Sequence, residues 1–253
     1  MSEGVSIALA DGILSIRFSR PDKKNAITQA MYLVMAEALL SIDASVRAVL
    51  FSGEGDSFSA GNDLKDFLVA PPQDDSHPTI RFIRALPKVQ VPMVAAVQGA
   101  AVGIGTTLLL HCDLVIAATN AVFALPFTKL GLVPEAGSSL LLPQLMGYQR
   151  AARLLLLGDS FTATEAERFG LVSQLVELDQ LESATQTVIG KLRALPASAL
   201  RATKALLQTE SGRTMNRIDE ELAIFKERLK SPELKEAATA FPEKRQPDFS
   251  KFS

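Results

Sequence analysis

One carboxylate stands alone in a stretch of small and apolar residues, LVPEAGSSL, at positions 132–140. The nearest other charged residue to Glu135 along the chain is Lys129, six positions earlier. One interpretation is a surface carboxylate that the dipole of a helix beginning near Ser138 stabilises. The other is a carboxylate in an apolar pocket, where desolvation raises its pKa and makes it a proton carrier near neutral pH.

Three glycine-rich turns follow predicted strands, at positions 53–63, 99–105 and 131–137. Glycine lets the backbone approach a ligand closely, and N–H groups at a helix start favour developing negative charge. Two such turns can direct N–H groups at one oxygen, although glycine also marks ordinary turns. If they do so beside a buried Glu135, the chemistry is removal of a proton next to a carbonyl group, which gives an enolate.

Other kinds of site find little support in the sequence. The GIG at 103–105 is not followed by the third glycine of a dinucleotide-binding motif, because position 108 is leucine. The two histidines are too few for a zinc site, and neither has a convincing partner for a serine triad. We expect His111 and Cys112 to be structural residues of the core.

The composition is that of a globular chain, with 253 residues, 47% of them hydrophobic and 21% charged. A net charge of −2 argues against nucleic acid as a partner. The single cysteine excludes an intrachain disulfide and fits a reducing compartment. The N-terminus has no basic region of a signal peptide, and the long apolar stretches are interrupted by proline, glutamine and glycine. We therefore expect a soluble, cytoplasmic protein without a membrane association.

The elements that must position these residues alternate between strands and helices in the first part of the chain. A hairpin is predicted around Asp11-Gly12, and a helix capped by Thr28 runs to about Ser41. Its apolar face comprises Met31, Leu33, Val34, Ala38 and Leu39. Further on we expect strands at 46–53, 91–99, 113–118 and 121–125, and helices from about 63, at 79–86 and from about 103. The proline-rich segment 69–78 is predicted to be a flexible loop.

From about Gly147 the pattern becomes mainly helical. Helices are predicted at 148–157, 164–169, 179–194, 197–210 and 214–239, with one strand at 171–176. The whole is an α/β core with a helical C-terminal extension.

Several segments together resemble the crotonase superfamily, the family of enoyl-CoA hydratases and isomerases. They are FSAGNDLKDF (58–67), AAVQGAAVGIGTTLLLHCDLVIAA (95–118), FALPFTKLGLVPEAGSS (123–139) and TATEAERFGLVSQLV (162–176), with RPDKKNAI and AFPEKRQPDF in support. The resemblance covers essentially the whole chain. It implies an α/β crotonase spiral of repeated ββα units over 1–195 and an α-helical C-terminal trimerisation region over 196–253. It also implies a homotrimer or a dimer of trimers, and an acyl-CoA thioester substrate. Coenzyme A is then part of the substrate, and no other cofactor or metal is expected.

The resemblance assigns the oxyanion hole, by motif position, to the backbone N–H groups of Asn62 and Ile104. Hydratases of the family activate water with two glutamates, whose positions here hold Thr107 and Phe127. Efficient hydration is therefore not expected. Glu135 instead matches the single acid of Δ3,Δ2-enoyl-CoA isomerases, which moves a proton from C2 to C4 of a 3-enoyl thioester.

The family also suggests substrate contacts. Those nearest coenzyme A are Lys23, Lys24, Ala26, Ala60, Asn62, Asp63, Leu64 and Lys65, and from a neighbouring subunit Phe241 and Lys244. Gly103 is a further predicted substrate contact. The acyl pocket is assigned to Phe67, Phe127 and Leu132, together with Leu68 and Phe82. The two lysines also fit a solvated loop, and the apolar residues also fit ordinary core. Alternatives to the isomerase are another enolate reaction, such as decarboxylation or thioester hydrolysis, and a non-catalytic acyl-CoA binder. RNA binding occurs within the superfamily, but the acidic balance disfavours it here.

Overall fold

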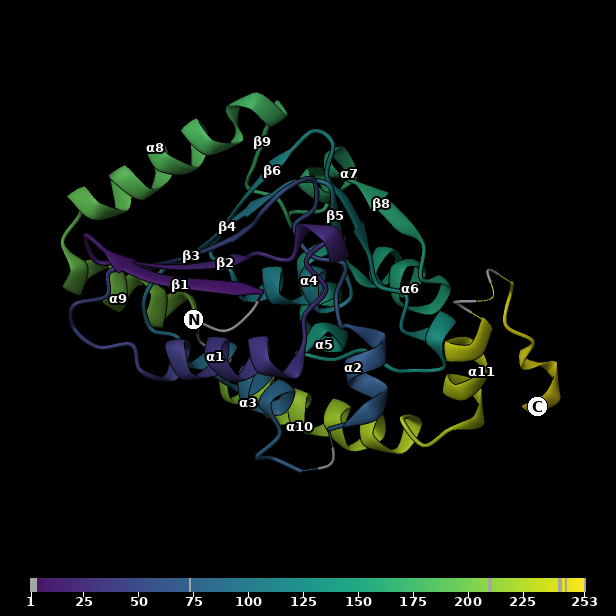
Figure 1. Cartoon of the computed structure of the whole chain (residues 1–253). Coiled ribbons are helices and arrows are strands. Elements are labelled where there is room, and N and C mark those ends of the chain that lie inside the picture. Colours follow the sequence, from purple (N-terminus) through teal and green to yellow (C-terminus); the bar gives the residue numbers. More distant parts are fainter. Residues whose placement is uncertain (1–3, 73, 209–210, 241–242, 244, 253) are drawn as a thin grey trace.

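A computed structural model describes residues 4–72, 74–208, 211–240, 243 and 245–252 (Figure 1). Its main sheet has six strands in the order β1-β2-β3-β4-β6-β9. They are β1 (Val5–Ala10), β2 (Ile13–Phe18), β3 (Ala48–Gly53), β4 (Met93–Val97), β6 (Leu114–Ala118) and β9 (Gln174–Val176). The pair β1 and β2 is antiparallel, which confirms the hairpin around Asp11-Gly12. All other pairs of this sheet are parallel.

A second sheet joins β5 (Ala100–Val102), β7 (Val122–Ala124) and β8 (Ser160–Thr162). Strands β5 and β7 pair in parallel, and each follows a strand of the main sheet after a short turn. The chain thus steps from one sheet to the other twice, which is the ββα spiral that the resemblance implies. Neither β5 nor β8 was predicted from the sequence, because three residues are too few to show an alternating pattern.

The main sheet is covered on both faces. Helix α8 (Leu181–Ala194) lies over one face, where its Leu181, Ile189 and Leu192 pack against Val94 and Ile116 of the sheet. The other face belongs to the main core, which also contains side chains of α1 (Gln29–Leu40) and α3 (Pro78–Ala85). Parallel strands that are buried on both faces are expected to be almost wholly apolar. The sequence of β4, MVAAV, is buried at all five positions.

Helix α1 begins after Thr28, whose side chain accepts a hydrogen bond from the N–H of Met31, as expected for the predicted cap. Its buried face differs from the predicted one in part. Leu33 is 37% exposed, whereas Tyr32 and Met35 are buried. Helix α1 is apolar on nearly all sides, so its sequence alone does not determine which side is buried. Packing against α3 determines it.

Short helices follow the glycine-rich turns. They are α2 (Leu64–Val69), α4 (Ile104–Thr107) and α5 (Ser138–Met146). Helices α6 (Tyr148–Leu157), α7 (Ala163–Arg168) and α9 (Ala197–Leu207) agree with the prediction within a few residues. The segment 69–78 joins α2 to α3, and its flexibility stays a prediction. None of the helices in the described part of the chain is both long and apolar enough to cross a membrane.

The prediction of one helix over 214–239 was wrong. The structure has α10 (Ser211–Arg228) and α11 (Pro232–Ala240) instead. Ser231 accepts a hydrogen bond from the N–H of Leu234, at 3.2 Å, and so begins a new helix. Pro232 lies at its first position, where proline is tolerated, and it cannot continue the preceding helix.

Candidate active site

Glu135 is buried, with only 2% of its surface exposed, in the turn that precedes α5. The hydroxyl of Thr107, in α4, donates a hydrogen bond to Oε1 of Glu135 at 2.7 Å. The interpretation as a surface carboxylate is therefore excluded. Thr107 stands where the resemblance would have a hydratase glutamate, and here it binds the carboxylate of Glu135.

Burial is the main reason why the pKa of Glu135 is raised from 4.5 to about 8. The Thr107 hydrogen bond opposes this rise, and the nearby carboxylate of Glu221 adds to it. With a pKa of about 8, this carboxyl group exchanges a proton readily near neutral pH. Its position and its proton affinity both suit a general base that later acts as an acid.

Two of the predicted glycine-rich turns lie side by side. Ser59 pairs with the 100–102 strand, accepting from the N–H of Val102 and donating its own N–H to Ala100, each at 2.9 Å. Gly61 has a φ of +86°, and a Cβ there would lie 2.6 Å from the carbonyl oxygen of Val102. Only glycine fits this close approach without strain.

This approach places the Asn62 and Ile104 amides on adjacent turns. On both sides of Asn62 the backbone is paired with Ile27, through Gly61 O and the N–H of Asp63. Ile104 opens α4, so its N–H has no partner within the helix. Within the described residues neither amide donates a hydrogen bond to the protein. Both N–H groups can therefore donate to an oxygen of a ligand.

Tyr32 connects the acid to this pair of turns. Its buried hydroxyl donates to Oδ1 of Asn62 at 2.5 Å. Burial raises the pKa of Tyr32, and the charge of Glu135 raises it further, so the two groups are electrostatically coupled. Tyr32 was not among the site residues predicted from the sequence. Its only signal was a hydroxyl group within a largely apolar helix.

The turn around Glu135 is held by two more residues that the sequence analysis did not assign to the site. Nε2 of His111 lies 2.8 Å from the carbonyl oxygen of Ala136 and is the donor in this contact. The carboxylate of Glu221, in α10, accepts from the N–H of Gly137 at 2.6 Å and of Ser139 at 2.8 Å. His111 is buried, as predicted, and burial lowers its pKa to about 4. It is therefore neutral at physiological pH.

The two segments assigned to coenzyme A come together. The N–H of Ala60 donates to Lys24 O at 2.8 Å, and the hydroxyl of Ser59 donates to Asn25 O at 2.9 Å. Asp63 caps α2 and forms an ion pair with Arg20 at 3.1 Å. These contacts bring the segments 23–26 and 60–65 together at one corner of the fold. The two segments carry the predicted contacts Lys23, Lys24, Ala26, Ala60, Asp63, Leu64 and Lys65. Both lysines and Lys65 are exposed, as phosphate contacts require, and their role stays a prediction.

The residues assigned to the acyl pocket are buried apolar side chains. Phe127 and Leu132 are 6% and 7% exposed and belong to the main core, and Phe67 meets Phe225 of α10 edge to face at 6.0 Å. Leu68 is different, with 42% of its surface exposed. Phe241 and Lys244 lie outside the described residues.

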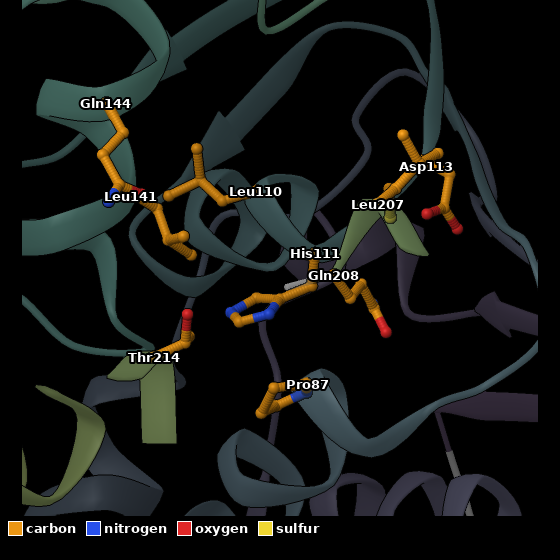
Figure 2. Close-up of a pocket in the computed structure, with 10 residues that line it drawn as sticks. Pro87, Leu110, His111, Asp113, Leu141, Gln144, Leu207, Gln208 and Thr214 are labelled. Carbon is orange, nitrogen blue, oxygen red and sulfur yellow. The ribbon is translucent and has the colours of Figure 1, made fainter. Parts of the chain in front are cut away.

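A cavity of about 440 Å³ lies beside His111 (Figure 2). The His111 ring lies there among the side chains of Pro87, Gln208 and Thr214. Glu135 does not line this cavity. In the described ranges no three His, Cys, Asp or Glu side chains are grouped so that they could hold a metal ion.

Comparisons with known proteins identify the family of this chain. The family model described as enoyl-CoA hydratase/isomerase matches residues 9–251. The 1,2-epoxyphenylacetyl-CoA isomerase of Escherichia coli K12 is 33% identical, with 99% of each chain covered. The peroxisomal enoyl-CoA delta isomerase 3 of Mus musculus is 35% identical, over 95% of this chain and 78% of the mouse protein. The crystal structure of an enoyl-CoA hydratase/isomerase from Pseudoalteromonas atlantica T6c has a TM-score of 0.92 at 38% identity, covering 98% of this chain and 100% of that one. The chain therefore belongs to the enoyl-CoA hydratase/isomerase family of the crotonase superfamily, as an enzyme that acts on acyl-CoA thioesters.

Proposed function

We propose that this protein converts 3-enoyl-CoA to the conjugated 2-enoyl-CoA, with Glu135 as the proton shuttle. The observation that carries the proposal is the buried Glu135 carboxylate, whose pKa is about 8 and whose hydrogen-bond partner is a neutral hydroxyl. A relative named as an enoyl-CoA delta isomerase, at 35% identity, supports the same reaction.

In the proposed reaction, ionised Glu135 removes a proton from C2 of the 3-enoyl thioester. The electron pair of the broken C–H bond moves toward the thioester oxygen, which the N–H groups of Asn62 and Ile104 hold as an oxyanion. The protonated carboxyl group then returns its proton to C4, and the double bond ends between C2 and C3. One carboxylate thus performs both proton transfers, and no water molecule takes part.

Hydration fits the site less well. A water molecule that adds to a 2-enoyl thioester must be activated by an acid and a base, and the family places these on two glutamates. Here Phe127 fills one position with a buried apolar ring. Thr107 fills the other and donates its hydroxyl to Glu135. Exclusion of water from such a site favours proton transfer within the substrate.

We extend the proposal to the substrate, the location and the oligomeric state of the enzyme. The substrate is an acyl-CoA of fatty-acid degradation, with coenzyme A bound along the corner formed by Lys24, Ala60 and Lys65, and neither a metal nor a separate cofactor takes part. We also propose a cytoplasmic homotrimer or dimer of trimers. Exposed apolar side chains of α6, Tyr148 at 71%, Leu156 at 66% and Leu157 at 57%, support an association of subunits.

A second candidate is a different enolate reaction on another coenzyme A thioester. It is favoured by the full-length similarity to an Escherichia coli protein named 1,2-epoxyphenylacetyl-CoA isomerase. Such a reaction would use the same oxyanion hole, and analysis of the products distinguishes the two.

The test is to add a 3-enoyl-CoA and follow the ultraviolet absorbance of the conjugated thioester, for the wild type and Glu135→Gln. We expect fast conjugation by the wild type and a loss of about 10²- to 10⁴-fold in the variant, the usual contribution of a general base. Glu165→Gln is the matched control, because it removes a carboxylate of the capping box of α7. Its rate should equal that of the wild type.

Two outcomes contradict the proposal. If the wild type binds acyl-CoA and forms no conjugated product, the protein catalyses another enolate reaction or only binds its ligand. If 3-hydroxyacyl-CoA accumulates from 2-enoyl-CoA as fast as the double bond moves, water reacts in this site and the proposal of an isomerase without hydratase activity fails.

A further inference from the structure

The peptide group between Ala136 and Gly137, one residue after Glu135, is held at its carbonyl oxygen and at its N–H by buried side chains from distant parts of the chain. His111, in the 3-10 turn after α4, donates to the carbonyl oxygen of Ala136 at 2.8 Å. Glu221 accepts from the N–H of Gly137 at 2.6 Å, across a separation of 84 residues. Its second oxygen accepts from Ser139 at 2.8 Å.

This turn needs support because its backbone is strained. Ala136 has a φ of +57° although it carries a Cβ, and it is fully buried. A left-handed conformation at a residue other than glycine is unfavourable and persists only where its surroundings enforce it. The direction of the Glu135 side chain depends on this turn, since Glu135 is the residue immediately before it.

Glu221 also replaces a cap that the local sequence cannot supply. Helix α5 begins at Ser138, and the residue before it is Gly137 at a φ of +74°, with no side chain. A serine or aspartate cap needs extended backbone at that position, which this turn excludes. The carboxylate of Glu221, in α10, takes the place of such a cap, because it accepts hydrogen bonds from free N–H groups at the start of α5. The positive end of the α5 dipole favours its negative charge.

Keeping an acid at this point is costly in free energy. Glu221 is only 5% exposed, and a buried carboxylate must be compensated by hydrogen bonds. Burial raises its pKa, while Ser139, the N–H of Gly137 and the charge of Arg217 lower it. An apolar residue at this position would pack in α10 without this penalty. It would leave unpaired the buried N–H of Gly137 and the partly buried N–H of Ser139.

We propose that Glu221 is a positioning residue of the active site, which directs the carboxylate of Glu135 by holding the amides of Gly137 and Ser139. The inference rests on the proposed role of Glu135 as the proton shuttle. It gives the helical C-terminal region a part in the chemistry of its own chain, in addition to any role in assembly. His111 supports the opposite side of the same peptide.

Several polar groups face Glu135 or its turn, and the test must account for all of them. Thr107 comes from α4 and Tyr32 from α1, Glu221 comes from α10 with Arg217 beside it, and His111 contacts Ala136. Glu221 is the like charge in this set that raises the pKa of Glu135. Its replacement by glutamine removes that charge and frees the positive end of α5, and both effects lower the pKa of Glu135.

The experiment compares wild type, Glu221→Gln and Glu165→Gln in the full-length protein. Steady-state kcat and KM for a 3-enoyl-CoA are measured from pH 5.5 to 9. Without substrate, the carboxyl titration of Glu135 is followed by infrared difference spectroscopy against Glu135→Gln.

We expect Glu221→Gln to lower kcat about ten- to hundredfold, to change KM less than about threefold, and to lower the pKa of Glu135. A misplaced catalytic group typically has an effect of this size. Glu165→Gln also removes a carboxylate that accepts a backbone N–H at a helix start, and it should change none of these quantities.

The proposal is overturned if folded Glu221→Gln keeps the kcat and the Glu135 titration of the wild type. Should that variant fail to fold, Glu221→Asp is measured instead. Its shorter side chain keeps the negative charge but places the carboxylate farther from the N–H groups of Gly137 and Ser139. An unchanged kcat in Glu221→Asp then overturns the proposal, and a reduced kcat with nearly unchanged KM supports it. The titration separates this inference from the proposed function. If the wild type does not isomerise but Glu221→Asp, which keeps the charge, shifts the titration of Glu135, the proposed function fails and the positioning role stands.

Discussion

Two glutamates in different regions of the molecule have pKa values that are shifted in opposite directions from that of an ordinary glutamate. Glu135, in the buried turn before α5, has its pKa raised to about 8, mainly by burial. Glu236, on α11, has its pKa lowered to about 2, mainly by a hydrogen-bonded ion pair with Arg245 of the C-terminal tail. The N–H of Asp248 donates to the same Glu236 oxygen at 2.9 Å. Figure 1 shows this tail beside α11 at the edge of the fold.

The difference shows that access to water and the charge of the partner decide what a glutamate can do. Glu135 has a neutral hydroxyl and another carboxylate nearby, so its proton affinity is high enough for exchange near neutral pH. Glu236 faces a guanidinium group and stays ionised, which suits it to fastening the tail and not to proton transfer. The following three predictions test this contrast, in order of decreasing effect.

The largest effect is expected on the pH dependence of catalysis. The base must be ionised to remove a proton, and with a pKa of about 8 half of Glu135 is ionised at pH 8. At pH 6 only about 1% is ionised, so kcat/KM should be roughly fiftyfold lower there. Initial rates of conjugation from pH 5.5 to 9 measure this, and Glu236→Gln should give the same profile. A rate that is flat over this range would show that Glu135 is not the titrating base.

A smaller effect is expected on stability. The folded pKa of Glu135 is raised above its unfolded value of 4.5, so between pH 4.5 and about 8 only the folded state holds this proton. The free energy of unfolding therefore falls as the pH rises through that window. Glu135→Gln does not titrate, so at pH 8 it should be more stable than the wild type by a few kcal/mol, relative to their difference near pH 4.5. Urea unfolding of both proteins at pH 4.5, 6 and 8, at one protein concentration, measures this difference in the free energy of unfolding. A difference that does not grow with pH contradicts a desolvated Glu135.

The smallest effect is expected at Glu236, because its ion pair lies at the surface and is screened by solvent. Its folded pKa is lowered, so its contribution is present above pH 4.5 and is lost as the pH falls through about 2. Glu236→Gln should lower the melting temperature at pH 7 by no more than about 2 °C. Thermal scans at pH 7 and pH 3 measure the change, which should shrink at the lower pH and in high salt. An equal loss at both pH values would mean that the side chain contributes by packing.

The sequence determined the features that arise from residues close together along the chain. The hairpin at Asp11-Gly12, the cap at Thr28 and the helix start near Asp63 each depend on a few neighbouring residues. Glu135 was also recognisable, as the one acid in an apolar glycine-rich stretch. The helical character of the last third was clear, whereas the three-residue strands and the break at Ser231 were not, since their local patterns are short or weak.

Only the tertiary structure decided how these parts meet. Ser59 pairs with Ala101, and Glu135 meets Thr107 and Glu221, across separations that no local pattern encodes. The pKa of Glu135 likewise depends on the removal of water by the surrounding core, and burial exists only after distant segments have packed together. Thus the acid itself was visible in the sequence, but its proton affinity and its orientation are properties of the folded molecule.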